Sequence, residues 1–240
     1  MGSYLNPGSM LFRGSLRSKI YIDKSGLIEK INELVCTEQK YVCVSRPRRF
    51  GKSMAANMLA AYYKKDEDTK PLFDKLLISQ AKSYEEHLNQ YDVIRINMQQ
   101  FLSETHNMEE MLSKLRNYLI MDLQEAYEKI RFREKTSLVQ TMKDVFAYTG
   151  CPFIILIDEW DCLFREYQKD KEAQKKYLDF LRAWLKDQDY VGLAYMTGIL
   201  PIKKYGSHSA LNMFIEYSMT DPGDVVAEGQ HIIQVDAVVN

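Results

Sequence analysis

A short apolar segment, followed by a basic loop and a helix-forming run, constrains the fold of this chain more than any other feature. Residues 41–45, Tyr-Val-Cys-Val-Ser, are β-prone and predict a buried strand. Residues 46–53 are Arg-Pro-Arg-Arg-Phe-Gly-Lys-Ser, and residues 54–63 are rich in helix formers. A strand, a tight loop ending in Gly-Lys-Ser and a helix, in this order, are typical of a phosphate-binding loop.

The loop supplies most of the groups that phosphate binding needs. Its backbone N–H groups would surround an anion, and the N-terminus of the following helix adds partial positive charge. We expect the nucleotide contacts to come from Arg48, Arg49, Phe50, Gly51, Lys52 and Ser53. Lys52 would reach the β- and γ-phosphates, and the Ser53 hydroxyl would bind Mg²⁺. The usual Walker A pattern has glycine at position 46, where this chain has arginine, so a solvated basic turn is the alternative.

A second apolar run ends in two acids. Residues 153–159 are Phe-Ile-Ile-Leu-Ile-Asp-Glu, which predicts a central strand of a parallel sheet. Because ligands of open α/β sheets bind at the carboxyl ends of the strands, we expect Asp158, as the Walker B acid, beside Lys52. Asp158 would hold Mg²⁺ through water, and Glu159 would orient or deprotonate the attacking water. The alternative is a buried strand followed by two solvated acids.

The two residues that follow these acids, Trp160 and Asp161, each have two possible interpretations. Trp160 either stacks on a ligand or packs as a large hydrophobic side chain at the top of the sheet, and we favour packing. Asp161 is either a third acid of the site or a helix cap, and we favour the cap.

Periodicity outlines the rest of the fold. Further strands are predicted at 93–98 and 191–197, and the first of these is expected beside the loop strand. Helices are predicted at 26–36 and 177–186, and two more between 107 and 146. Together these elements predict a three-layer αβα sandwich with a mostly parallel sheet.

The chain resembles the AAA-ATPase-like proteins of bacteria and some archaea, P-loop ATPases whose loop commonly reads R-P-R-R-F-G-K-S. The matching segments are 21–25 (Tyr-Ile-Asp-Lys-Ser), the loop 46–53, 157–161 (Ile-Asp-Glu-Trp-Asp), 196–199 (Met-Thr-Gly-Ile) and 211–214 (Leu-Asn-Met-Phe). In this family arginine at the first glycine position is normal. The resemblance implies a P-loop NTPase fold of the AAA/ASCE type, with ATP and Mg²⁺ as ligands.

The resemblance also implies roles for residues outside the two motifs. Thr197 takes the place of the polar sensor that ends the strand next to the acidic one; the alternative is a threonine that closes a strand before a glycine turn. Tyr21 and Asp23 become candidates for contact with the base or the ribose, although a structural role in a helix packed at the sheet edge is favoured. Lys203, Lys204 and His208 follow in a polar loop and are interpreted as solvated charge.

The similarity extends from about residue 20 to about residue 222. We therefore expect an irregular N-terminal arm at 1–19, a P-loop ATPase domain at 20–222 and a divergent tail at 223–240. Longer relatives continue into a helical lid, and many then carry a restriction-nuclease-like domain. The tail differs from that continuation and is interpreted as a short strand or as the end of a truncated gene.

Composition narrows the possible partners. The 240 residues carry a formal net charge of −1, so no global field attracts nucleic acid or anionic lipid. No apolar run is long enough to cross a membrane, and the N-terminus lacks a signal core. The four cysteines lack C-x-x-C spacing, which favours reduced thiols in a cytoplasmic protein. The four histidines have no ligand spacing, so no structural metal is expected.

The leading functional hypothesis is an ATP-binding P-loop domain that hydrolyses ATP and drives a conformational change in a partner or in a missing module. The alternative is a nucleotide-dependent scaffold or regulator with little or no hydrolysis, which the arginine at position 46 and the absent lid favour. A small-molecule kinase is a third possibility, but paired acids suit water activation. A protein partner or self-association is compatible with all three, and direct nucleic-acid binding is a minor option.

Overall fold

The strands form a single parallel sheet in the computed structural model, which describes residues 2–202 and 211–218. They are β1 (Tyr41–Ser45), β2 (Asp92–Asn97), β3 (Phe153–Asp158), β4 (Val191–Gly198) and β5 (Ile215–Ser218). Their order in the sheet is β2-β3-β4-β1-β5, and every neighbouring pair is parallel. The four strands predicted from sequence are confirmed, and β5 is an additional one.

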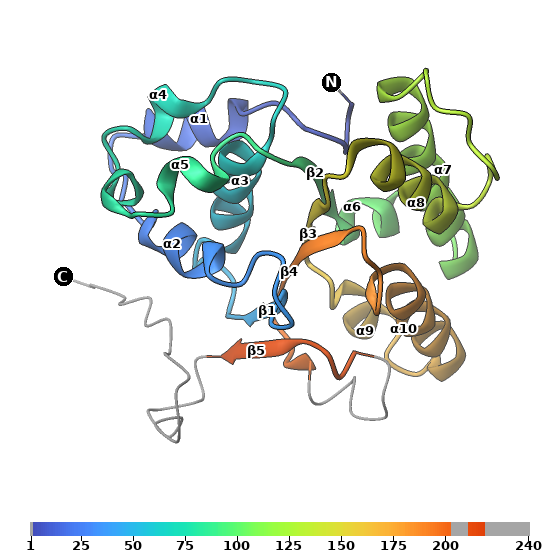
Figure 1. The fold of residues 1–240 in the computed structure, drawn as a ribbon. Helices are drawn as coiled ribbons and strands as arrows, with labels where there is room; N and C mark the ends of the chain where they lie inside the picture. Colours follow the sequence, from blue (N-terminus) through green and yellow to red (C-terminus); the bar gives the residue numbers. More distant parts are fainter. Residues whose placement is uncertain (1, 203–210, 219–240) are drawn as a thin grey trace.

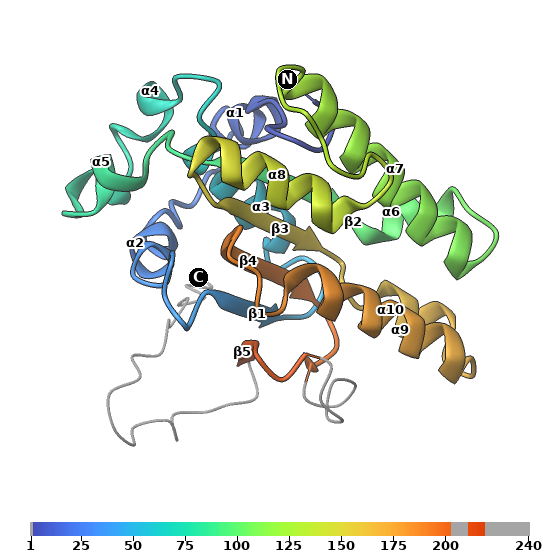
Figure 2. The ribbon, with the colours of Figure 1, turned by 45° about the vertical axis from the view of Figure 1, so that its right-hand side comes forward.

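Helices cover both faces of this sheet, which confirms the three-layer αβα sandwich (Figures 1 and 2). One face carries α1 (Met10–Leu16), α2 (Gly26–Asn32), α3 (Lys52–Tyr63), α4 (Lys70–Phe73), a 3-10 helix at Leu77–Gln80 and α5 (Tyr84–His87). The other face carries α6 (Met98–Ser103), α7 (Met108–Ala126), α8 (Leu138–Thr149), α9 (Cys162–Glu166) and α10 (Lys171–Leu185). No described helix is long and apolar enough to cross a membrane.

Strand side chains alternate between two separate hydrophobic cores. In β3, Ile154 and Leu156 point into the core under α3, whereas Ile155 and Ile157 point into the core under α7 and α10. Every residue of β3 is buried, which explains why its sequence is continuously apolar rather than alternating. The two-residue period places Asp158 on the same face as Leu156, the face that α3 covers.

The position of β2 differs from the prediction. The segment was expected beside the loop strand β1, but β2 pairs with β3 and ends the described sheet at the far side from β1. Both β3 and β4 lie between them. The apolar content of a strand records how deeply it is buried and carries no information on which strand becomes its neighbour, so this expectation had no physical basis in the sequence.

The described residues before 20 do not form the irregular N-terminal arm that was expected. This segment contains α1, whose Phe12 is buried, and its Leu5 forms an antiparallel bridge with Ile94 of β2. This bridge covers the outer edge of β2, where unpaired backbone groups would otherwise face solvent. Polar contacts anchor it: Asn6 and Lys65 both donate to the buried Asp92 carboxylate, at 2.8 Å each.

Local capping explains where the long helices begin and end. The side chains of Asn107, Ser137 and Asp170 accept hydrogen bonds from backbone N–H groups three residues ahead and start α7, α8 and α10. Gly150, with φ of 65°, ends α8 in a left-handed conformation that glycine adopts without strain.

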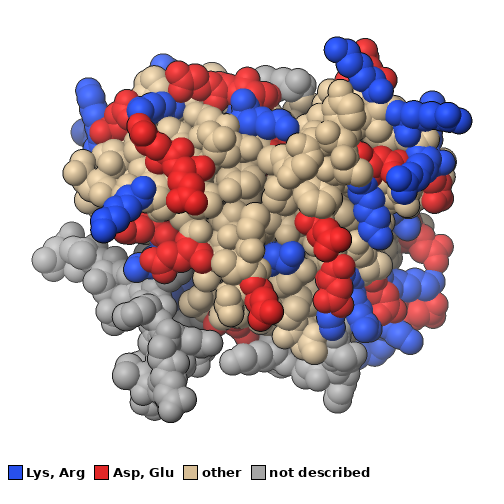
Figure 3. All heavy atoms as spheres, viewed as in Figure 1, with Lys and Arg blue, Asp and Glu red and all other residues tan. Residues whose placement is uncertain are grey.

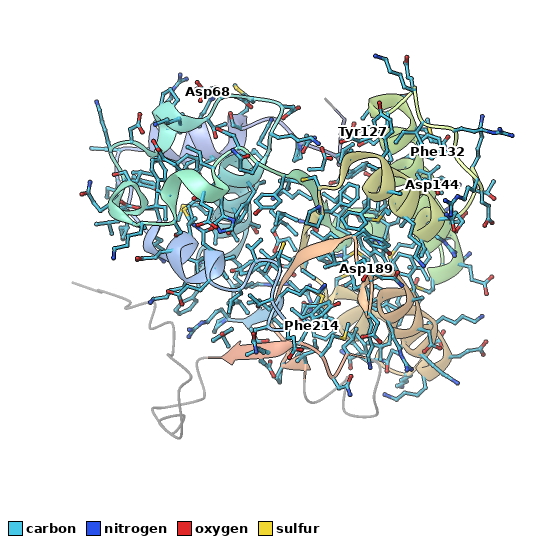
Figure 4. All side chains as sticks on the ribbon, viewed as in Figure 1. Asp68, Tyr127, Phe132, Asp144, Asp189 and Phe214 are labelled. Atoms are coloured by element: carbon cyan, nitrogen blue, oxygen red, sulfur yellow. The ribbon has the colours of Figure 1, made fainter. Side chains whose placement is uncertain are left out.

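Phe214, labelled in Figure 4 beside β5, packs its ring against Tyr41 at 5.6 Å between ring centroids.

Candidate functional site

The basic loop at residues 46–51 joins the carboxyl end of β1 to α3. Its first N–H group, from Arg46, donates to the carbonyl of Gly198 at the end of β4, at 3.0 Å. The chain then turns through left-handed conformations at Arg49 (φ 71°) and Gly51 (φ 77°). Glycine adopts this conformation freely, whereas arginine there costs roughly 1–2 kcal/mol. The loop therefore turns without a glycine at position 46.

The loop leaves backbone donors available. Within the described residues, no acceptor is bonded to the N–H groups of Arg48, Arg49, Phe50 or Gly51. These residues are exposed apart from Gly51, which is half-buried. Together with the first turn of α3 they form a set of unpaired N–H groups at a helix N-terminus, the arrangement that favours bound anions.

Lys52 crosses the inside of the loop. Its ammonium donates to the carbonyls of Arg46 at 2.8 Å and Pro47 at 2.9 Å, and the residue is only 8% exposed. Because an ammonium has three donors, one remains for another acceptor. Ser53 follows at the exposed start of α3. A methyl group built on Gly51 would lie 3.8 Å from Nζ of Lys24, so a second lysine reaches the same helix N-terminus.

Asp158 has one carboxylate oxygen in use and one left over. Oδ1 accepts from the Thr197 hydroxyl at 2.5 Å and from the Glu159 N–H at 3.1 Å. Oδ2 is buried and has no hydrogen-bond partner in the described part of the chain. An orphaned carboxylate oxygen fits a hard cation such as Mg²⁺, which is commonly held by one or two carboxylates together with water and substrate phosphates. Among residues 2–202 and 211–218, no group of three or more His, Cys, Asp or Glu could hold a metal alone.

The same sheet face brings Asp158 and the start of α3 into one region. α3 packs against β2, β3 and β4, and it begins at Lys52. Arg95 of β2 also lies on this face; its Nε is buried without a described partner. Burial lowers the pKa of Arg95, and the Asp158 charge opposes that shift. Arg95 could not be anticipated from the sequence, because it is one arginine in an otherwise apolar strand.

Glu159 is held in an unusual backbone conformation and is paired with a cation. Its φ is 55°, and its Oε2 accepts from Nη2 of Arg165 on α9. Nε of Arg165 lies 3.6 Å from Oδ2 of Asp161. Arg165 was not among the residues expected from the sequence. The i,i+4 spacing from Asp161 to Arg165 was the available signal, because such pairs meet on a helix.

Trp160 and Asp161 serve the structure around the acids. Trp160 is fully buried and packs against Phe164 at 5.6 Å between ring centroids, as the packing interpretation expects. Asp161 occupies the N-cap position of α9, but its side chain makes no cap bond. Instead its Oδ2 accepts from the N–H groups of Ile199 at 3.0 Å and Leu200 at 2.8 Å, so it ties the end of β3 to the turn after β4.

Tyr21 and Asp23 were the candidates for contact with the base or the ribose, and Asp23 has a structural role. Its carboxylate accepts from the N–H groups of Ser25 at 2.8 Å and Leu77 at 2.7 Å. The Tyr21 hydroxyl is buried without a described partner, and burial raises the pKa of Tyr21 to about 12. Contact of Tyr21 with a base or ribose stays a prediction. Lys203, Lys204, His208 and the tail 223–240 lie outside the described residues.

A cavity of about 790 Å³ lies elsewhere, between α7, the start of α8 and α10. Its lining includes Arg116 and Lys176, and Lys176 already pairs with Glu109 at 2.7 Å. It is on the opposite sheet face from α3, so it is separate from the site at the loop. On the face drawn in Figure 3, acidic and basic side chains are interspersed and form no continuous basic stripe.

Comparison with known proteins agrees with this geometry. A family described as "Predicted AAA-ATPase" matches residues 15–207. An uncharacterized protein from the vnfD 5′ region of Azotobacter chroococcum mcd 1 is 24% identical over 204 residues, which are 83% of this chain and 37% of that protein. The chain thus spans little more than a third of this relative. The family match covers most of the sequence, and the structure adds a buried Lys at the start of α3, an acidic strand end and an all-parallel sheet. The chain therefore belongs to the predicted AAA-ATPase family.

Proposed function

We propose that this chain binds Mg-ATP at the loop between β1 and α3 and hydrolyses it. The observation that supports the proposal best is that hydrogen-bond donors and an acceptor, all without described partners, lie at the carboxyl ends of the strands. The loop has N–H donors without described acceptors, and Asp158 has a buried oxygen without a described donor. A phosphate chain that carries a divalent cation satisfies both at once.

Each residue has a defined role in this proposal. The N–H groups of Arg48, Arg49, Phe50 and Gly51 surround the phosphates, and Lys52 uses its remaining donor on the β- and γ-phosphates. Ser53 and, through water, Asp158 would hold Mg²⁺, which would neutralise charge that develops on the phosphate oxygens. Glu159 orients or deprotonates the attacking water, and Thr197 senses the γ-phosphate through its position beside Asp158.

The chemistry attributed to the protein is positioning and electrostatic stabilisation. The transferred phosphoryl group needs little covalent assistance, so the catalytic gain comes from fixed donors aimed at the phosphate oxygens and from an oriented water. The conformational change would pass to a partner or to a module beyond residues 20–222. A cytoplasmic location fits the four cysteines, which are all free thiols.

A nucleotide-dependent regulator without hydrolysis is the second candidate. The observation in its favour is that the Glu159 carboxylate is already engaged by Arg165. A carboxylate that stays in this pair throughout the nucleotide cycle would bind no attacking water, and the protein would then report nucleotide binding rather than turnover.

Mg-ATP binding and phosphate release by the purified chain test the proposal. Lys52→Ala should abolish detectable binding, because it removes the cation inside the loop, and Glu159→Gln should bind ATP normally but release phosphate far more slowly. Lys175→Ala and Glu128→Gln are matched controls, because both side chains are exposed and make no described contact. Binding by wild type without turnover would select the regulator, and failure of wild type to bind ATP would refute both.

A further inference from the structure

Arg165 has no part in the roles proposed above for the loop and the acids, yet it pairs with the Glu159 carboxylate. Both side chains are largely buried, with exposed fractions of 21% for Glu159 and 18% for Arg165. Surface ion pairs contribute little, but a shielded pair of this kind is held rigidly, and removal of one partner leaves a poorly compensated charge. The contact therefore fixes where the Glu159 carboxylate points.

Arg165 is in turn connected to the rest of the site. Its Nε faces the fully buried Asp161, whose Oδ2 holds the N–H groups of Ile199 and Leu200. The carbonyl of Leu200 accepts from the Ser45 hydroxyl at 3.2 Å, and Ser45 is the last residue before the loop. A continuous series of contacts thus runs from Glu159 through Arg165 to the turn after β4 and the start of the loop.

The backbone at Glu159 needs such support. A non-glycine residue with φ of 55° is in a left-handed conformation that costs roughly 1–2 kcal/mol. Strained backbone at a site persists when surrounding contacts determine it. Only Oε2 of Glu159 is bonded to Arg165, so Oε1 is left to accept from another donor. A catalytic base that is oriented by a third group shows this same division between its two ends.

We propose that Arg165 is the positioning residue of Glu159: its guanidinium holds one carboxylate oxygen so that the other faces the attacking water. This role rests on the proposed ATP hydrolysis. A guanidinium presents donors in a planar fork and can serve Glu159 and Asp161 together, whereas a lysine ammonium is a single point charge on a flexible stem. Arg165→Lys therefore keeps the charge but loses the geometry.

The positioning role of Arg165 is tested by steady-state phosphate release. The proteins compared are wild type, Arg165→Gln, Arg165→Lys, Glu159→Gln and the double variant Glu159→Gln/Arg165→Gln. Arg165→Gln should lower kcat about 10- to 100-fold, as expected for a misplaced catalytic group, and leave KM for ATP within about twofold. Arg165→Lys should fall between wild type and Arg165→Gln. In the double variant kcat should equal that of Glu159→Gln alone, because Arg165 acts through Glu159.

Arg182→Gln is the matched control, since Arg182 is exposed on α10 and its side chain makes no described contact. Melting temperatures separate lost folding from lost positioning, and Arg165→Lys carries the test if Arg165→Gln does not fold. A wild-type kcat in a folded Arg165→Gln protein would overturn the positioning role of Arg165. The role would also be overturned if the double variant lost kcat by the product of the two single-variant factors. Absence of turnover in wild type would instead refute the proposed function, and this role with it.

Discussion

The hydroxyl of Thr197 donates a hydrogen bond to Oδ1 of Asp158 across the neighbouring strands β4 and β3, at 2.5 Å. Both residues are fully buried. The bond uses one side of the Asp158 carboxylate and so leaves the orphaned Oδ2 as the side available to a cation. It also joins the two strand ends that carry the candidate magnesium ligand and the candidate sensor.

Thr197→Val removes this donor with little change in side-chain shape. Oδ1 of Asp158 would keep only the N–H of Glu159, so we expect a loss of about 1–3 kcal/mol in the free energy of unfolding. Phosphate release should fall as well, because the carboxylate loses its orientation. Thr197→Ser retains the hydroxyl, so it should preserve phosphate release and lose only about 0.8 kcal/mol of stability for the buried methyl group. Urea denaturation and phosphate-release assays measure the two properties, and a Val variant as stable and as active as the Ser variant would contradict the prediction.

Gly198→Ala should destabilise the protein, because the site has no room for a methyl group. A Cβ at this position would lie 2.6 Å from Nε1 of Trp160 and 2.9 Å from Oδ1 of Asp161. Both side chains are buried and cannot move aside freely, so we expect a cost of about 1–3 kcal/mol. Gly14→Ala is the control: it lies in α1 with nothing within 4 Å of the new methyl group, and it should stabilise by about 0.5–1 kcal/mol. Thermal unfolding distinguishes the two.

Glu67→Gln should reduce stability in a pH-dependent manner. Burial alone would raise the pKa of Glu67, but hydrogen bonds from Ser9, Lys64 and Arg13 outweigh it and lower the pKa to about 2. A carboxyl whose pKa is lower in the folded state than the usual value of about 4.3 stabilises the fold above that value. This contribution disappears as the pH falls from about 4.3 to about 2. The difference in unfolding free energy between wild type and Glu67→Gln should therefore be largest near neutral pH and shrink in acid. A difference that stays constant from pH 7 to pH 3 would show that the charge of Glu67 is not involved.

Lys24→Ala should weaken Mg-ATP binding. The Lys24 ammonium lies close to Gly51 at the N-terminus of α3, and no ion pair compensates it among the described residues. A cation near the positive end of a helix is unfavourable until an anion binds there. We expect the dissociation constant to rise about tenfold, the equivalent of roughly 1.4 kcal/mol. The dependence on salt concentration should become shallower. Isothermal titration with Lys19→Ala as an exposed control measures the effect, and equal affinities of the two variants would exclude Lys24 from the site.

The linear pattern was sufficient for the elements and for the main motifs. Residues 41–45 and 153–157 are strands because their apolar runs are buried on both faces, and a run of that kind shows its character locally. The loop before α3 was recognisable for a similar reason, because the composition of a tight turn before a helix is a short-range requirement. The placement of Asp158 at the carboxyl end of its strand followed from parallel-sheet geometry.

Tertiary structure alone decided which segments became neighbours. The sequence of β2 does not encode that β3 and β4 separate it from β1, and nothing in residues 2–9 marks them as the cover of a sheet edge. The pairing of Arg165 with Glu159 likewise depends on how α9 leaves the strand end. Strand identity is written in a few adjacent side chains, whereas strand order and ion-pair choice are set by contacts between residues far apart in the chain, whose energies depend on the packed arrangement as a whole.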